Sequence, residues 1–389
     1  MKSHKKKTLL VILIVILALI VAKVIWVSIA TRHHGDFESE KEDLLRRRDF
    51  LIEKVMTDPQ RLIGEMPRIV GPQFQGEWAL YSCSMLSAAL VNTTLIYDEE
   101  REENIARIDS LIKIVMSPEL RAYDCERWGE DPLETLGGDK SHVSYLSHLA
   151  WMIGGYKQIG GDGKYDELYD RLCETMNRRM LASPNMNLQT YPGEYVYVPD
   201  MMVAIVALSL YSQQNNGEYD ATIKKWVEQA KQQWLEPETG LISSFLPVRR
   251  SGIFENAPVK GSYTALSCYY LTFVDKEFAR GQYERLKTNF LQKRMITGFK
   301  EYHNERCWIG TDIDAGLIIA NLSPTGTAFG VGSVTYFGDW DLRKDMLKTG
   351  EMAGTTWHGK GKNHYLLADM ALVGEAIMLA MRTATEWKN

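Results

Sequence analysis

The feature that most constrains this chain is an alternation of two kinds of segment with helical periodicity. One kind is charged on most of its faces, and the other is apolar nearly all round. A helix that is apolar on every side has to be enclosed, whereas an amphipathic helix covers other structure from outside. The charged segments are residues 36–56, 99–116, 162–181, 218–234, 276–293 and 339–350. The apolar segments are residues 77–96, 141–156, 199–213, 261–274, 312–337 with a break at Pro324, and 364–381.

The apolar segments begin 51 to 64 residues apart, which is the signature of a repeat of helix pairs. Six outer helices alternating with six inner ones can close into a ring. We therefore expect an all-α fold, an (α/α)6 barrel or toroid, with an open solenoid of helix pairs as the alternative. The Tyr- and Val-rich stretch 190–198 predicts a short hairpin near the rim.

A membrane segment precedes the repeat. Four lysines in the first seven residues are followed by an apolar run from Thr8 to Ala30, interrupted by Lys23. At about 1.5 Å per residue this run spans the roughly 30 Å of bilayer hydrocarbon. A cleaved signal peptide is the alternative, since Ala18 and Ala22 form a small-residue site before Lys23.

The charges that flank the apolar run predict its orientation. Lysines precede it and a cluster of acids follows it, which favours a cytoplasmic N-terminus and an outward-facing body. We expect a cytoplasmic stub (1–7), a single-pass transmembrane signal anchor (8–30) and a periplasmic or extracellular barrel domain (31–389).

Composition narrows the function classes. The 389 residues are 45% hydrophobic and 24% charged, as in an ordinary globular protein. The net charge of −5, with both signs mixed, provides no basic surface for nucleic acid, so nucleic acid is not an expected partner. The cysteines are odd in number, scattered and without a CxxC pair, which predicts neither disulfides nor a zinc site: Cys83, Cys125, Cys173, Cys268 and Cys307.

The loops that enter the inner helices hold the unusual residues of this chain. In the expected barrel every inner helix runs the same way, so these loops meet at one mouth. Convergent acids, imidazoles and aromatic rings in a concavity are the default site hypothesis. The groups are Glu77 with Trp78, Asp139 with His142, the loop 191–200, Lys260 with Tyr263, Asp312 with Asp314, and His364 with Tyr365.

Several of these acids also have a structural interpretation. Glu77, Asp139, Asp200 and Asp312 lie at predicted helix starts, where a carboxylate accepts bonds from free backbone N–H groups and complements the helix dipole. Asp312 and Asp314 cannot both be caps, so at least one is available for chemistry.

Glu194 is not explained by capping, because it precedes its helix by several residues. Its loop carries Tyr191, Tyr195 and Tyr197. Burial among these rings would raise the pKa of the Glu194 carboxyl group, as a general acid near neutral pH requires.

His142 follows Asp139 by three residues, a spacing at which a carboxylate can orient an imidazole, although a packed core histidine is equally consistent. Trp78, Tyr263, Trp308 and Tyr365 are candidate stacking platforms for a substrate, and core packing is their alternative role.

Cofactor motifs are not matched. Residues 354–361 read GxxxxGKG but lack the final Ser or Thr of a phosphate-binding loop, and residues 312–316 lack the later ligands of an EF-hand. We expect neither a metal nor a cofactor.

Three runs carry a family resemblance: HVSYLSHL at 142–149, YPGE at 191–194 with Pro199-Asp200, and GTDIDAG at 310–316. They resemble the linalool dehydratase/isomerase-like domain family. The resemblance covers roughly residues 70 to 385 and implies an (α/α)6 barrel, akin to six-hairpin glycosidases. It also implies acid/base addition and removal of water at an allylic alcohol, with cysteines in the site. His142 is the residue that transfers most directly, whereas the 191–200 loop has no cysteine.

The leading hypothesis is an enzyme that cleaves a glycan-like substrate with paired carboxylates. Glu194 would donate the proton, and Asp314 or Asp312 would activate water. The expected substrate-binding residues are Trp78, Tyr191, Tyr195, Tyr197, Tyr263, Trp308, His364 and Tyr365. The alternatives are a lyase or hydratase-isomerase of a small molecule that uses His142 with Asp139, and a non-catalytic envelope binding module.

Overall fold

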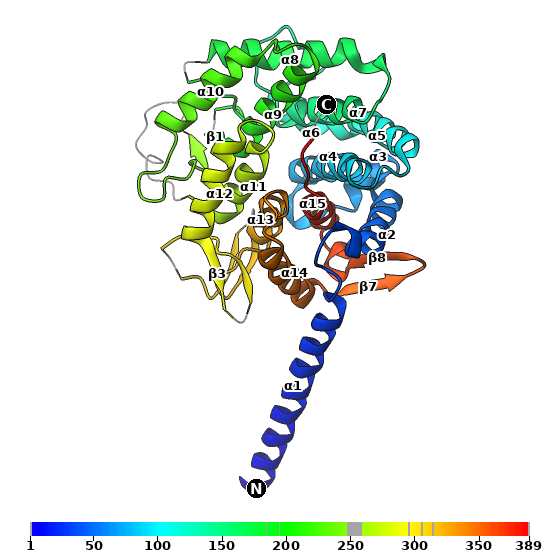
Figure 1. The fold of residues 1–389 in the computed structure, drawn as a ribbon, viewed down its shortest axis with the longest axis vertical. Helices are drawn as coiled ribbons and strands as arrows, with labels where there is room; N and C mark the ends of the chain where they lie inside the picture. Colours follow the sequence, from blue (N-terminus) through cyan, green and yellow to red (C-terminus); the bar gives the residue numbers. More distant parts are fainter. Residues whose placement is uncertain are drawn as a thin grey trace.

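The computed structural model describes residues 2–183, 185–193, 195–246, 259–294, 296–304, 306–312 and 315–387. This part of the chain is mostly helical, with a few short antiparallel strand pairs. A long apolar helix, α1 (Lys2–Ala30), projects from one edge of the body (Figure 1). The prediction of an all-α protein with one N-terminal apolar helix is confirmed at this level.

The two kinds of segment form two kinds of helix. The charged segments form α2 (Phe37–Val55), α5 (Arg101–Val115), α8 (Asp166–Ala182), α10 (Asp220–Gln233), α12 (Lys276–Phe290) and α14 (Trp340–Gly354). The apolar segments contain α4 (Pro72–Tyr97), α7 (Val143–Gln158), α9 (Val198–Gln214), α11 (Gly261–Leu271), α13 (Pro324–Tyr336) and α15 (Leu372–Arg382). Shorter helical elements are α3 (Pro59–Gly64), α6 (Pro118–Trp128), η1 (Arg68–Val70), η2 (Gly163–Tyr165) and η3 (Leu366–Asp369).

The apolar helices pack against one another in a closed order. α4 contacts α7, and the contacts continue through α9, α11, α13 and α15, which packs back on α4. The charged helices pack on the outside of this set, with α2 against both α4 and α15 (Figure 1). Small residues permit the close approach. A Cβ atom on Gly332 of α13 would come within 2.3 Å of the Met381 sulfur in α15, so only glycine fits there.

Two predicted inner segments begin later than the sequence indicates. Residues 312–323 are not helical, because strands β5 (Ile309–Asp312) and β6 (Gly316–Ile319) pair here and α13 starts only at Pro324. Positive φ angles at Gly316, Ala320 and Asn321 are incompatible with a helix.

A second strand pair replaces the start of the last inner segment. Strands β7 (Thr356–Gly359) and β8 (Lys362–Tyr365) form a hairpin, and α15 starts only at Leu372. The hairpin turns through Lys360 and Gly361, both at positive φ, as a tight two-residue turn requires.

The stretch 190–198 contains a strand but not a local hairpin. β1 (Val196–Tyr197) pairs with the distant β2 (Phe245–Leu246), so the pairing joins two loops next to α9. A further pair, β3 (Leu291–Lys293) with β4 (Thr297–Phe299), follows α12.

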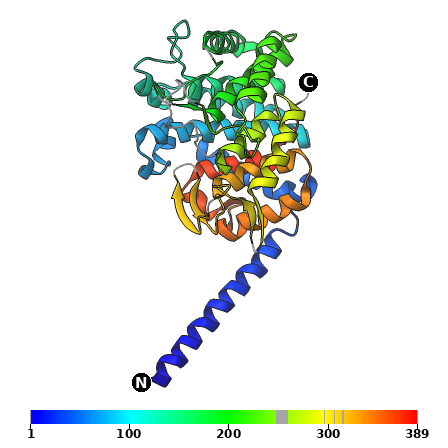
Figure 2. The same ribbon diagram turned by 90° about the vertical axis from the view of Figure 1, so that its left-hand side faces the viewer.

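Two helices among the described residues are long and apolar enough to cross a membrane. α4 is one of them, but most of it is buried inside the body, whereas α1 is almost entirely exposed. In Figure 2, where the view is turned by 90°, α1 again projects away from the body. α1 is therefore the candidate membrane helix.

The last two turns of α1 are bonded to the body. Lys23 Nζ donates to the backbone oxygen of Glu351, 3.0 Å away, and to the hydroxyl of Thr355. Trp26 Nε1 donates to Glu351 Oε1 at 3.0 Å. The lysine that interrupts the apolar run therefore has its partners at the end of α14.

A buried ionic network joins α2 to the C-terminal part of the chain. Arg343 of α14 and Arg382 of α15 have no exposed side-chain surface, and both donate to Glu40 Oε2 of α2, at 2.9 and 2.8 Å. Burial alone would raise the pKa of Glu40, but the two guanidinium groups lower it to about 2. Glu40 is thus ionised at neutral pH and holds two buried cations.

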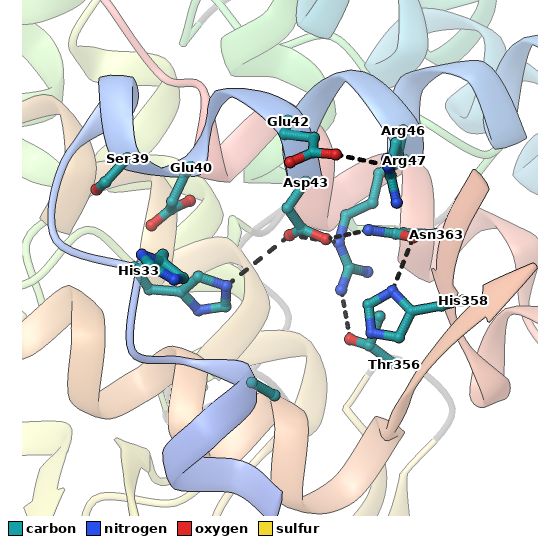
Figure 3. Close-up of a pocket in the computed structure, with 12 residues that line it drawn as sticks. His33, Ser39, Glu40, Glu42, Asp43, Arg46, Arg47, Thr356, His358 and Asn363 are labelled. Carbon is teal, nitrogen blue, oxygen red and sulfur yellow. Dashed lines mark hydrogen bonds and ion pairs between the residues drawn. The ribbon is translucent and has the colours of Figure 1, made fainter. Parts of the chain in front are cut away.

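Arg47 extends the same network to the β7–β8 hairpin. Its Nη1 lies 2.7 Å from Glu375 Oε1 of α15, and its Nη2 donates to the Thr356 hydroxyl at 2.5 Å. Asn363 of β8 donates to Asp43 Oδ1 at 2.8 Å (Figure 3). An outer helix from the start of the domain is thereby fixed to elements from its end.

Replacing Glu40 tests how much this network contributes to the unfolding free energy. Glu40→Gln leaves two buried guanidinium groups short of their counter-charge, which costs about 3–5 kcal/mol of unfolding free energy. Glu42→Gln, two residues away, breaks only an exposed pair with Arg46 and is expected to change little. Denaturant unfolding of the full chain in detergent, followed by near-UV circular dichroism, measures both. Equal losses in the two variants would contradict this account.

Candidate functional site

A cluster of polar side chains lies where the N-terminal parts of α4, α7 and α9 meet. Glu77 and Tyr81 stand one turn apart on α4, so they share a face of that helix. The Tyr81 hydroxyl donates to Asp200 Oδ1 of α9 at 2.6 Å. The two helices are thus joined through a carboxyl group that sequence analysis treats as a possible cap.

Asp200 is fully buried, and burial is the largest cause of the shift in its pKa. Burial, together with the negative charge of Glu77, raises the pKa of Asp200 to about 7, and the bond from Tyr81 opposes that rise. Within the described residues, Asp200 Oδ2 has no hydrogen-bond partner. Asp200 is therefore a carboxyl group that carries its proton up to neutral pH and has one oxygen available.

Glu77 has the opposite environment. Arg127 of α6 donates to its Oε2 at 3.1 Å, and the Tyr191 hydroxyl donates to the same oxygen at 3.1 Å. Ser144 of α7 donates to Oε1 at 3.2 Å. The two oxygens of Glu77 thus accept bonds from one guanidinium group and two hydroxyl groups. The Arg127 guanidinium also stacks on the Tyr191 ring, 3.9 Å from its centre.

Neither acid acts as a helix cap. The residue before α4 is Gly71 and the residue before α9 is Tyr197, and no side-chain capping bond is formed at either helix start. The capping interpretation of Glu77 and Asp200 is therefore wrong. Both carboxyl groups instead belong to the polar cluster where α4, α7 and α9 meet.

His148 completes the cluster from α7. Its Nδ1 lies 2.9 Å from the Ser84 hydroxyl, and its ring packs against Tyr81, with centres 4.3 Å apart. Burial lowers the pKa of His148 to about 3, so the imidazole is neutral. Its Nε2 is buried without a hydrogen-bond partner among the described residues. A neutral ring with a free nitrogen can exchange a proton or hold a substrate hydroxyl.

His142 is oriented by a different acid from the one that the sequence indicates. Its Nδ1 lies 2.5 Å from Asp124 Oδ2, and its Nε2 lies 3.3 Å from Glu130 Oε1. Asp139 instead has a 98% exposed side chain, which pairs with Arg178. The predicted Asp139–His142 pair is therefore not formed, because α7 begins only at Val143, so the three-residue spacing does not lie on a helix. His142 itself is fully buried with both nitrogens engaged.

Aromatic rings form a wall beside α11. Tyr197 and Tyr263 lie 4.7 Å apart, and Phe245 of β2 contacts both. Lys260 packs over Tyr263 and bonds to Asp312 Oδ2 at 2.7 Å. Asp312 thus connects the β5–β6 hairpin to the start of α11, in an ion pair. Tyr191 lies by Glu77, Trp78 packs partly buried against the core, and Tyr195 is half-buried.

Other predicted site residues lie elsewhere. Trp308 is 69% exposed beside β5, so it does not face an enclosed wall. His364 stacks on Phe50 of α2, and Tyr365 packs under Arg47. These two residues belong to the network at α2, because they lie in β8 of the hairpin, before α15 starts. Glu194 and Asp314 lie outside the described residues.

Sequence reasoning missed Tyr81, Arg127 and His148. A signal for His148 was present: a histidine among serines in an otherwise apolar helix is a buried polar group that needs a partner. Arg127 gave no signal, because α6 is a short extra helix outside the repeat.

In the described part of the chain, no group of three or more His, Cys, Asp or Glu side chains is placed to hold a metal ion. Two cavities, of about 210 and 560 Å³, are lined by residues of α2 with the β7–β8 hairpin and by residues near Phe337 and Trp340. Neither contains a residue of the Glu77–Asp200 cluster.

Comparison of the sequence with models of protein families and with curated proteins finds no match. The candidate site therefore has to be interpreted from its own chemistry.

The contrast between the two acids makes a testable prediction about stability. The raised pKa means that folded Asp200 keeps a proton that the unfolded chain releases near pH 4, so the wild-type chain loses stability as pH rises from about 4 to 7. Asp200→Asn mimics the neutral acid and removes that loss. At one pKa unit per 1.36 kcal/mol, the variant gains up to about 4 kcal/mol over wild type at pH 8 and little at pH 4.

Glu77→Gln is the matched comparison. It leaves the buried Arg127 without its counter-charge, so it lowers the unfolding free energy by about 3–5 kcal/mol at pH 8. Denaturant titrations of both variants at pH 4, 6 and 8 provide the measurement. If stability fell only in Asp200→Asn at pH 6, where the raised pKa keeps the wild-type carboxyl group protonated, the raised pKa of Asp200 would be refuted.

Proposed function

We propose that this protein is a membrane-anchored enzyme that breaks or forms a carbon–oxygen bond by acid/base catalysis. Asp200 is the proton donor and Glu77 the proton acceptor. The observation that carries the proposal is the different environment of two neighbouring carboxyl groups: Asp200 is fully buried with one oxygen unpartnered among the described residues, whereas Glu77 accepts a bond from Arg127. A pair of titratable groups whose protonation is pushed apart is the usual mark of an acid and a base.

We infer that the inner helices form an (α/α)6 barrel with the site at its mouth. The closed order of contacts from α4 through α15 back to α4 supports this arrangement. So does the position of Glu77, His142, Asp200 and Tyr263 at the N-terminal ends of four of these helices.

The substrate that fits best is a small hydroxylated molecule. Asp200 and His148 are both fully buried, behind Tyr81 and the Arg127–Tyr191 stack. A donor at this depth suits a molecule that enters whole rather than a polymer lying across an open cleft. Protonation of a hydroxyl by Asp200, loss of water, and removal of a neighbouring C–H proton by Glu77 give an alkene. The reverse sequence is hydration. This is the reaction class that the family resemblance implies.

Hydrolysis of a glycoside is the second candidate. Two carboxyl groups and a wall of Tyr197, Tyr263 and Phe245 are what a glycosidase needs, with Asp200 protonating the leaving oxygen and Glu77 activating water. The buried donor favours attack on the terminal sugar of a short chain.

α1 is proposed to be the anchor, with the body on the outer side of the membrane. The helix is continuous from Lys2 to Ala30, and Lys23 and Trp26 bond to Glu351. The lysines before the apolar run support an N-terminus in the cytoplasm.

The activity is tested on full-length protein in lipid nanodiscs. Wild type, Asp200→Asn, Glu77→Gln and Asp139→Asn are incubated with terpene alcohols and short glycosides, and products are identified by mass spectrometry. Asp200→Asn is expected to lower the rate by 10²-fold or more, the usual scale for a general acid, while Asp139→Asn has no effect. New alkenes identify a lyase and new reducing ends a hydrolase. Activity that survives Asp200→Asn but not Asp139→Asn would contradict the proposal.

The pH profile provides a finer test of Asp200. As the proton donor it must be protonated, so kcat/KM falls as pH rises above about 7. The Tyr81 bond lowers the pKa of Asp200, so Tyr81→Phe moves this alkaline limb to higher pH. A limb that stays in place in Tyr81→Phe would assign the titration to another group.

A further inference from the structure

The body exposes large apolar side chains in the segment that follows Thr355, the residue to which Lys23 of α1 is bonded. Trp357 of β7, Leu366 and Leu367 of η3, and Met370 are 56, 45, 49 and 71% exposed. Exposed large apolar groups gathered in one place mark an interaction surface. We call these four residues the anchor patch.

The anchor patch is joined to α1 through hydrogen bonds at Thr355. Lys23 donates to the Thr355 hydroxyl, and the Leu366 N–H donates to the Thr355 backbone oxygen at 3.1 Å. Trp357 lies in β7, which begins directly after Thr355. Figure 1 shows α1 meeting the body next to β7 and β8.

The length of α1 places this junction at membrane depth. The apolar residues before Lys23, 8–22, extend only about 22 Å at 1.5 Å per residue, against a hydrocarbon layer of roughly 30 Å. The next turns also expose apolar side chains, with Ile25 and Ile29 55 and 56% exposed. If lipid covers these side chains, the bilayer reaches about 10 Å beyond Lys23 along the helix. At that level α1 is already bonded to the body.

Lys23 itself is compatible with that depth. A charged group within a membrane needs a partner, and Lys23 has the Glu351 carbonyl and the Thr355 hydroxyl. Trp26 and Trp357 are of the residue type that collects at the membrane interface.

We propose that the anchor patch inserts into the outer interface of the same bilayer that α1 spans, so that the body lies against the membrane. This inference rests on the proposed anchoring by α1. The occupant is lipid, because the patch is linked through Thr355 to the helix that is proposed to cross the bilayer, and that helix exposes apolar side chains beyond Lys23. Interfacial segments of this kind bury their apolar face about 5–10 Å deep, which matches the overlap between α1 and the body.

The test uses full-length protein in lipid nanodiscs with a nitroxide label at Met370→Cys, in a background where the partly exposed Cys125 and Cys307 are serine. Collision with oxygen, which concentrates in lipid, is compared with collision with a water-soluble nickel chelate. Ile69→Cys is the matched control, because Ile69 is 94% exposed but precedes α4, far along the chain from the patch. Ile16→Cys reports on α1 itself.

The oxygen-to-nickel ratio is expected to be several-fold higher at Met370→Cys than at Ile69→Cys, and high at Ile16→Cys. Equal ratios at positions 370 and 69, with a high ratio at 16, overturn the inference but leave the anchor in place. A low ratio at position 16 removes the anchor and the inference together. Spin–spin broadening at position 370 that disappears on dilution with unlabelled protein assigns the patch to a second copy and also overturns it. Leu367→Cys repeats the measurement if Met370→Cys does not fold.

Discussion

Buried charges hold α2 against α14 and α15, the last two helices of the chain. α2 precedes every inner helix in the sequence, yet it packs against α15, the last helix, as well as α4. Glu40 holds Arg343 and Arg382, and Arg47 holds Glu375. Buried ion pairs are costly to desolvate, so they add little net stability, but they are very costly to break. Their value here is specificity: α2 can occupy only the position in which every charge finds its partner.

The geometry of the candidate site depends on how these helices pack against one another. Glu77 lies on α4, Asp200 on α9 and His148 on α7, so a displacement of α4 would separate Tyr81 from Asp200. The chemistry arises from differences in burial and charge rather than from unusual residues. Burial near another carboxyl group raises the pKa of Asp200, whereas Arg127, Tyr191 and Ser144 donate to Glu77.

Periodicity predicted the helices well and the site poorly. The alternation of charged and apolar segments located α4, α7, α9 and α11 to within a few residues, because burial on all sides leaves a strong mark on composition. It failed at residues 312–323, where β5 and β6 pair and residues at positive φ follow, and at residues 364–371, which contain the end of β8 and the short η3.

The site residues depended on contacts that the sequence does not encode locally. Asp124 rather than Asp139 lies beside His142, although Asp139 is closer in the chain. Arg127 reaches Glu77 across fifty residues, from a helix outside the repeat. Glu77 and Asp200 lie within the first two turns of α4 and α9, near the helix starts that the sequence predicts, but their assignment as caps failed, because capping depends on where a helix starts to within one residue.

The pairing of α2 with α14 and α15 also has a consequence for biosynthesis. Some 300 residues separate Glu40 from Arg343, and more separate it from Arg382. During synthesis α1 and α2 emerge first, while the arginines that neutralise Glu40 emerge last. Until then α4, apolar on nearly every face, lacks the α15 surface that covers it. The nascent chain therefore holds α4 without part of its cover until the last helix of the body has been synthesised.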